Sequence, residues 1–103
     1  MMRQRYYRLI GREVVPCDFD YVLDNMRALY KVIARDEIGN ILVRTIFSSS
    51  DQRWIPFGRP LVFETMVFGG PHNLRQIRCS TYDEAEANHS KMVEKMREFA
   101  NKG

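Results

Sequence analysis

The sequence predicts a single α+β domain, residues 1–103, in which an antiparallel sheet of four to six strands carries two helices packed on one face. Three observations favour this class. The chain has 103 residues, 45% of them hydrophobic and 12% aromatic, which suits one globular core. Strand-like runs come in pairs joined by turn signals. Helical patterns separate those pairs, so the expected order is ββ-α-ββ-ββ-α, which favours antiparallel pairing.

The first predicted elements are a hairpin and a helix. Residues 6–17, "YYRLIGREVVPC", contain two β-prone runs around Gly11, and Pro16 stops the second. Asp18 is the expected N-cap of an amphipathic helix of about three turns. Its apolar positions recur at helical spacing: Phe19, Val22, Leu23, Met26, Leu29 and Tyr30.

A second hairpin is predicted around Gly39-Asn40, a pair that can adopt positive φ. After it, residues 41–47 alternate in the manner of a strand with one buried face. Residues 60–68, "PLVFETMVF", and 74–80, "LRQIRCS", predict a third hairpin. The clearest element is the last helix, which starts at a capping box of Thr81 and Glu84. Its apolar stripe is Tyr82, Ala85, His89, Met92, Met96 and Phe99.

Glu64 is an ionisable residue inside an apolar strand. A five-residue turn over residues 69–73 pairs it with Arg78 on the next strand. This pair is either a structural ion pair or a perturbed carboxylate beside an anion-binding arginine. His89 would join them if the last helix packs over that face. Glu64, Arg78 and His89 are thus weak catalytic candidates. Because no nucleophile motif accompanies them, the sequence leaves open whether the protein is an enzyme and favours the view that it is not.

Composition limits the other functions. Cys17, Cys79, His72 and His89 lack the spacing of zinc ligands, so we predict no metal and no cofactor. The start resembles no signal peptide and no run is long enough to span a membrane, so the expected location is the cytoplasm. The formal net charge is +3. Basic and aromatic residues cluster near the start: Arg3, Arg5, Tyr6, Tyr7, Arg8 and Arg12. This cluster makes nucleic acid a possible partner. The alternative is an edge strand whose exposed positions are charged.

The segment 48–60, "SSSDQRWIPFGRP", is the one long irregular stretch. Loops of this length in small domains are mobile or functional. Its apolar side chains either fold back as a lid or project as anchors for a protein partner. The predicted partner-binding residues are Asp51, Arg53, Trp54, Ile55 and Phe57.

Two segments, "FETMVFGG" (63–70) and "RCSTYDEAEANH" (78–89), carry a resemblance. With Thr45, Phe47 and Asp51, they resemble a family of small uncharacterised proteins encoded by phages and prophages, over residues 41 to about 93. That family's pattern includes an Asp-His loop, "FETMVFGG" and "RYSTWDEAEAGH". Gln52 stands where the family has the loop histidine, and "RWIPFGRP" replaces a glycine- and proline-rich approach, so an Asp-His pair is not carried over to this chain.

The resemblance implies a phage-type accessory protein in the cytoplasm of a bacterial host. Small size and the irregular segment favour action by binding, through inhibition or modulation of a host or defence protein. Two alternatives stay open: a nucleic-acid-binding protein that uses the arginine-rich start, and a small enzyme built on Glu64, Arg78 and His89. Assembly into a homo-oligomer is also left open.

Overall fold

The structure, a computed structural model, describes residues 4–26, 30–53 and 57–102. Its elements follow the predicted order, and the α+β class is confirmed. They are β1 (Tyr6–Ile10), β2 (Glu13–Cys17), α1 (Phe19–Asp24), β3 (Tyr30–Ile38), β4 (Ile41–Ser48), β5 (Phe63–Phe68), β6 (Gln76–Cys79) and α2 (Tyr82–Lys102).

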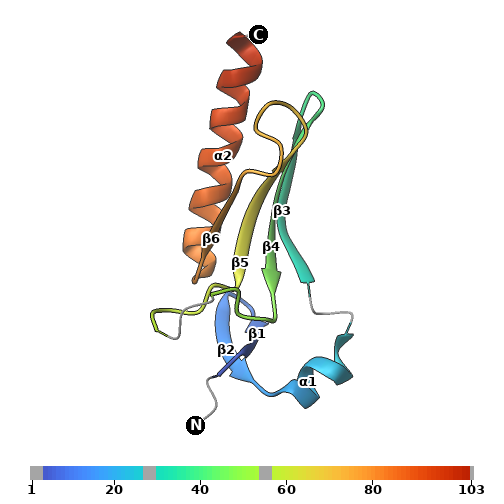
Figure 1. The fold of residues 1–103 in the computed structure, drawn as a ribbon, viewed down its shortest axis with the longest axis vertical. Coiled ribbons are helices and arrows are strands. Elements are labelled where there is room, and N and C mark those ends of the chain that lie inside the picture. The colour runs from blue at the N-terminus through green and yellow to red at the C-terminus, as the bar shows by residue number, and fades with distance from the viewer. Residues whose placement is uncertain (1–3, 27–29, 54–56, 103) are drawn as a thin grey trace.

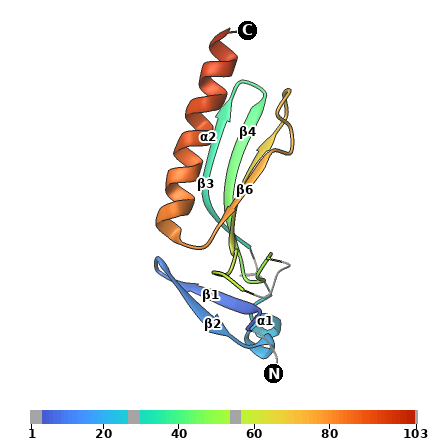
Figure 2. The same cartoon turned by 60° about the vertical axis from the view of Figure 1, so that its left-hand side comes forward.

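The strands form two antiparallel sheets rather than one. β1 and β2 make a two-stranded sheet, and β3-β4-β5-β6 make a four-stranded sheet in that order. The molecule is elongated, 51 × 27 × 20 Å, with the β1-β2 hairpin and α1 below one end of the larger sheet (Figure 1). Only α2 packs along that sheet, and no described element covers its other face (Figure 2). The expected pair of helices on one face is therefore reduced to one.

Alternation along the central strands decides which face α2 covers. In β4 the buried positions are Ile41, Val43, Thr45 and Phe47, and in β5 they are Phe63, Thr65 and Val67. The intervening residues are half-buried on the open face. The core consists of two apolar clusters. One joins the hairpin, the sheet and the start of α2: Tyr7, Phe47, Val62, Phe63, Cys79 and Ala85. The other lies further along α2: Ile41, Val43, Val67, Met92, Val93 and Met96.

The hairpin is attached at both of its ends. At its base, the backbone N–H of Tyr7 in β1 donates to the carbonyl of Ser49 at 2.8 Å. Ser49 directly follows β4, so this bond joins the hairpin to the end of the large sheet. At its tip, the Arg12 guanidinium bonds Asp83 and Glu86 in the first turns of α2 and lies 4.2 Å from the ring centroid of Tyr82. These contacts connect the small sheet to the large one.

The helix α1 is shorter than predicted. Asp18 is the N-cap, as expected, and its side chain accepts the N–H of Tyr21. The helix then ends at Asn25, whose backbone leaves the helical region (φ −123, ψ 41) and whose side-chain amide donates to the carbonyl of Tyr21. Val22 is its only buried residue. Its expected apolar stripe therefore stays largely in solvent: Phe19, Leu23 and Met26 are exposed, and Leu29 lies outside the described residues.

The β5-β6 turn packs closely against the β3-β4 turn. Gly69 has φ +91, and a Cβ at this position would lie 2.5 Å from the carbonyl oxygen of Asn40. The N–H of Gly69 also donates to the side-chain oxygen of Asn73 at 2.7 Å. Gly69 is therefore required both for its backbone conformation and for the close approach of the two turns.

We expect Gly69→Ala to lower the free energy of unfolding by about 3 kcal/mol, because it combines positive-φ strain with a backbone clash. Gly11→Ala is the matched control. It has a similar positive φ, +61, but no atom within 4 Å of the added Cβ, so its cost should be about 1 kcal/mol. Urea unfolding measures both. Equal losses would show that the contact with Asn40 contributes nothing.

Candidate functional site

Glu64 and Arg78 pair as the sequence predicts. They are direct partners in the β5-β6 ladder, and the Nε of Arg78 donates to Glu64 at 3.1 Å. Both lie on the open face of the sheet, with side chains 19% and 35% exposed respectively. An ion pair with this much solvent access contributes modestly to stability. The pairing with Arg78 explains why a carboxylate is tolerated in this strand, and no catalytic role is needed to account for Glu64.

His89 does not join that pair. It is buried on the α2 side of the sheet, whereas Glu64 and Arg78 face the opposite side. The proposed convergence of the three residues is therefore wrong. The reason is alternation: α2 covers the face of Phe63, Thr65 and Val67, and Glu64 belongs to the other face.

His89 instead belongs to a hydrogen-bond chain across the core. Its Nδ1 lies 2.8 Å from the Thr45 hydroxyl, which is 2.7 Å from the Thr65 hydroxyl, and its Nε2 lies 2.7 Å from Asp36. With a neutral imidazole, Nε2–H donates to the carboxylate, so Nδ1 accepts from Thr45 and Thr45 accepts from Thr65. The order of groups resembles a hydroxyl–His–Asp triad. However, Thr45 is 0% and Thr65 1% exposed, so neither hydroxyl is accessible to a substrate.

Asp51 organises the irregular segment that follows β4. Its Oδ1 accepts the backbone N–H groups of Arg53 at 3.0 Å and Leu61 at 2.9 Å, and its Oδ2 accepts the Nε of Arg53 at 2.6 Å. The N–H of Gln52 donates to the carbonyl of Leu61 at 2.9 Å. These bonds hold residues 51–53 beside Leu61, and we call the described residues 51–53 and 57–61 the clamped loop. The Asp51 side chain is 0% exposed, so it shapes the loop and cannot itself touch a partner.

The pKa of Asp51 reflects this role. Burial on its own would raise the pKa, but the two backbone N–H donors and the guanidinium of Arg53 outweigh burial and hold the pKa below its usual range. The carboxylate form is therefore the one that the folded loop requires.

The far side of the clamped loop presents Phe57. Its side chain is 70% exposed. The next residue, Gly58, accepts a hydrogen bond from Arg53 through its carbonyl, and Arg59 pairs with Glu84 of α2 at 2.9 Å. Phe57 thus projects from a loop that is tied to Asp51 at one side and to α2 at the other. Trp54 and Ile55, the other predicted anchors, lie outside the described residues.

Most of the described residues in the arginine-rich start have structural contacts. Tyr7 is buried, and the ring of Tyr6 lies 5.3 Å from that of Phe19. The Arg8 guanidinium lies 4.9 Å from the Tyr21 ring, and Arg12 is held by α2. Arg3 lies outside the described residues, and Arg5 is exposed. Most of these basic and aromatic residues therefore stabilise the packing of the hairpin.

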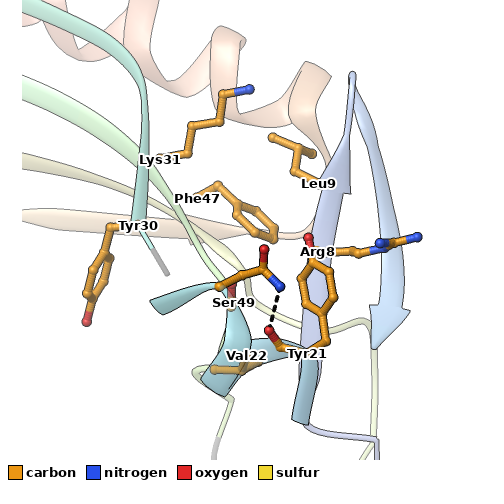
Figure 3. A pocket seen from close by; sticks show the side chains of 9 residues that line it. Arg8, Leu9, Tyr21, Val22, Tyr30, Lys31, Phe47 and Ser49 are labelled. Carbon is orange, nitrogen blue, oxygen red and sulfur yellow. Dashed lines mark hydrogen bonds between the residues drawn. The ribbon is translucent and has the colours of Figure 1, made fainter. Parts of the chain in front are cut away.

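A cavity of about 190 Å³ separates the hairpin from α1 and the ends of β3 and β4. Figure 3 shows Leu9, Phe47 and Tyr21 around it, with Tyr30 turned away from them. The dashed line marks the hydrogen bond that the side-chain amide of Asn25 donates to the backbone carbonyl of Tyr21, at the C-terminal end of α1. The cavity therefore lies at the junction between the hairpin unit and the large sheet.

Among residues 4–26, 30–53 and 57–102, no cluster of three or more His, Cys, Asp or Glu side chains could hold a metal ion. Neither of the two described helices has the length and apolar character needed to cross a bilayer.

Comparisons with protein-family models, with curated proteins and with solved structures found no match for this chain.

We expect Arg78→Ala to cost about 1 kcal/mol or less in the free energy of unfolding, because solvent reaches the open face of the sheet and partly screens the pair. Glu64→Gln and the double variant should lose a similar amount, which gives a small coupling energy in a double-mutant cycle measured by urea unfolding. A coupling of several kcal/mol would contradict the exposed-pair assignment.

The Asp51 clamp gives a pH-dependent prediction. Because the folded pKa is lowered, the carboxylate stabilises the fold above the unfolded pKa, near 4, and this contribution is lost as pH falls through the folded pKa. Asp51→Asn should therefore cost about 2–3 kcal/mol at pH 7 and progressively less in acid. Thermal unfolding from pH 7 to pH 2 measures the difference.

Asp24→Asn serves as the control for that experiment, since Asp24 is exposed at the end of α1. Its stability should follow the wild-type curve at every pH. A stability gap between Asp51→Asn and the wild type that stays constant down to pH 2 would contradict a role for the ionised carboxylate.

Proposed function

We propose that this chain is a small accessory protein that acts by binding another protein, with the clamped loop as its contact. The observation that carries the proposal is Phe57, a large aromatic side chain that is 70% exposed on a loop fixed by a buried carboxylate. A lid over the sheet would bury this ring. An anchor for a partner would present it, as here.

The bracing of the loop favours binding energetically. Association costs free energy when a loop and its side chains become ordered at an interface. Asp51, Arg53 and the Arg59–Glu84 pair hold the described parts of the loop, residues 51–53 and 57–61, in place before any partner arrives. Buried aromatic rings at the centre of an interface supply much of its binding energy. The exposed ring of Phe57, next to loop residues that are already held in place, combines both features.

The resemblance to phage-encoded proteins suggests the kind of partner. If this chain is phage-encoded, the protein that it binds belongs to the bacterial host or its defence machinery, and binding inhibits or modulates that protein. The enzyme alternative has less support, because Glu64 and Arg78 lie on the opposite side of the sheet from His89. The nucleic-acid alternative has less support because Tyr7 and Arg12 serve the packing of the hairpin.

Phe57→Ala tests the proposal. We expect the melting temperature to stay unchanged, because the ring is exposed, and affinity for the captured partner to fall by about 30-fold, which corresponds to 2 kcal/mol. Wild-type and variant proteins are used as bait in bacterial lysate, the retained proteins are quantified by mass spectrometry, and affinity is then measured with the purified partner.

Leu23→Ala is the matched control, because Leu23 is another exposed apolar residue, on α1 and away from the loop. It should retain partner as well as the wild type. Equal retention by the Phe57→Ala and wild-type proteins would overturn the assignment of the loop. The same holds if neither retains any protein above the background of an unrelated bait.

A further inference from the structure

β6 is an edge strand that runs beside α2. It pairs with β5 on one side, and among the described residues no strand pairs with its outer edge. In an antiparallel ladder the backbone groups of alternate residues point away from the paired strand. Edge strands of this kind can accept a further strand. Figure 1 shows β6 at one edge of the large sheet.

A groove of about 350 Å³ lies between β6 and α2. It is lined by Arg75, Gln76, Ile77, Lys91, Met92 and Lys95. Ile77 is 41% exposed, although it lies on the α2 side of the sheet, so α2 does not fully cover this edge. Ile77 and Met92 give the groove an apolar floor that could receive one side chain.

The charge of the groove is one-sided. Arg75, Lys91 and Lys95 are exposed, no carboxylate lines the groove, and none of the three forms a salt bridge within the described part of the chain. Several other cations of this chain have carboxylates beside them. Arg12 and Arg59 bond carboxylates of α2, and Arg97 shares its groove with Asp36 and Glu94. The β6-α2 groove therefore concentrates uncompensated positive charge in a chain whose formal net charge is +3.

We propose that this groove binds an extended acidic segment of a protein, which adds to β6 as a fifth strand. Backbone hydrogen bonds to the outer edge of β6 hold the segment, and its side chains alternate between the two faces of the sheet. An apolar side chain opposite Ile77 enters the groove. Acidic side chains two positions away on the same face meet Arg75 and the lysines of α2. The inference rests on the proposed function only in that the ligand is again a protein.

The ligand chemistry follows from what the groove lacks. Positive groups without partners favour a carboxylate-rich ligand, and electrostatic attraction also speeds encounter. An apolar floor beside a free strand edge favours a peptide with alternating side chains over a compact anion. The recognised pattern is thus one apolar residue flanked at a spacing of two by aspartate or glutamate.

A synthetic peptide tests the proposal directly. The probe is a nine-residue, fluorescently labelled peptide of threonine with leucine at its centre and aspartate two and four positions to each side. We expect saturable binding to the wild-type protein at about 50 mM salt, measured by fluorescence anisotropy, and weaker binding at higher salt. Replacing every aspartate by lysine, or methylating alternate backbone nitrogens, should each reduce affinity at least about tenfold, because one removes the charge match and the other the strand hydrogen bonds.

Lys91→Gln/Lys95→Gln should reduce affinity at least about tenfold. Its matched control is Arg97→Gln/Lys102→Gln, which removes the same charge from α2 outside the groove. Circular dichroism checks that both remain folded. Equal affinity of the two double variants, undiminished binding of the methylated peptide, or no binding of the aspartate peptide to the wild type would each overturn the inference.

Phe57→Ala separates this proposal from the proposed function. It should bind the peptide as tightly as the wild type while losing the partner captured through the loop. If Lys91→Gln/Lys95→Gln keeps its peptide affinity while Phe57→Ala loses that partner, the groove is wrong and the loop stands. The reverse result leaves the groove and removes the loop.

Discussion

A hydrogen-bond chain, Thr65–Thr45–His89–Asp36, buried except at the carboxylate of Asp36, fixes how α2 sits on the large sheet. It crosses β5, β4, α2 and β3, and it lies between the two apolar clusters of the core. Apolar contacts tolerate small shifts of a helix, but buried polar groups lose a good deal of free energy when a shift leaves them without partners. Both imidazole nitrogens are occupied here, so the helix has one satisfactory position. The rest of the arrangement depends on that position.

Once α2 is held there, the sheet has one face covered by the helix, one open face, and a groove between α2 and the β6 edge. Acidic residues in the first turns of α2 bind Arg12 of the hairpin and Arg59 of the clamped loop. The helix, the hairpin and the loop, which are distant in sequence, are thereby connected. The middle of the helix leaves Lys91 and Lys95 beside β6. The two proposed contact regions, the clamped loop and the β6-α2 groove, thus both follow from the placement of one helix.

Sequence patterns correctly predicted the features that depend on residues close together in the chain. The turn glycines and the alternation of β5 and β6 gave the correct partner for Glu64, and the capping box gave the start of α2. They could not decide which face α2 covers, because both faces of β5 carry large apolar side chains, Phe63 and Val67 on one and Met66 and Phe68 on the other. The misplacement of His89 follows from that ambiguity. Asp51 was singled out, but its bond to Leu61 spans an irregular segment that periodicity does not describe.

The residues that carry the phage-family resemblance have structural duties in this fold. Thr45 and His89 belong to the buried chain, Asp51 clamps the loop, Gly69 allows the two turns to meet, and Glu84 caps α2. These four polar residues, Thr45, Asp51, Glu84 and His89, each form internal hydrogen bonds, so they help to specify the fold of this chain. The side chains left free for a partner, Phe57 and the lysines of α2, lie outside that pattern. The residues that hold the fold of this chain are therefore separate from the proposed contact residues, which can change without disturbing the core.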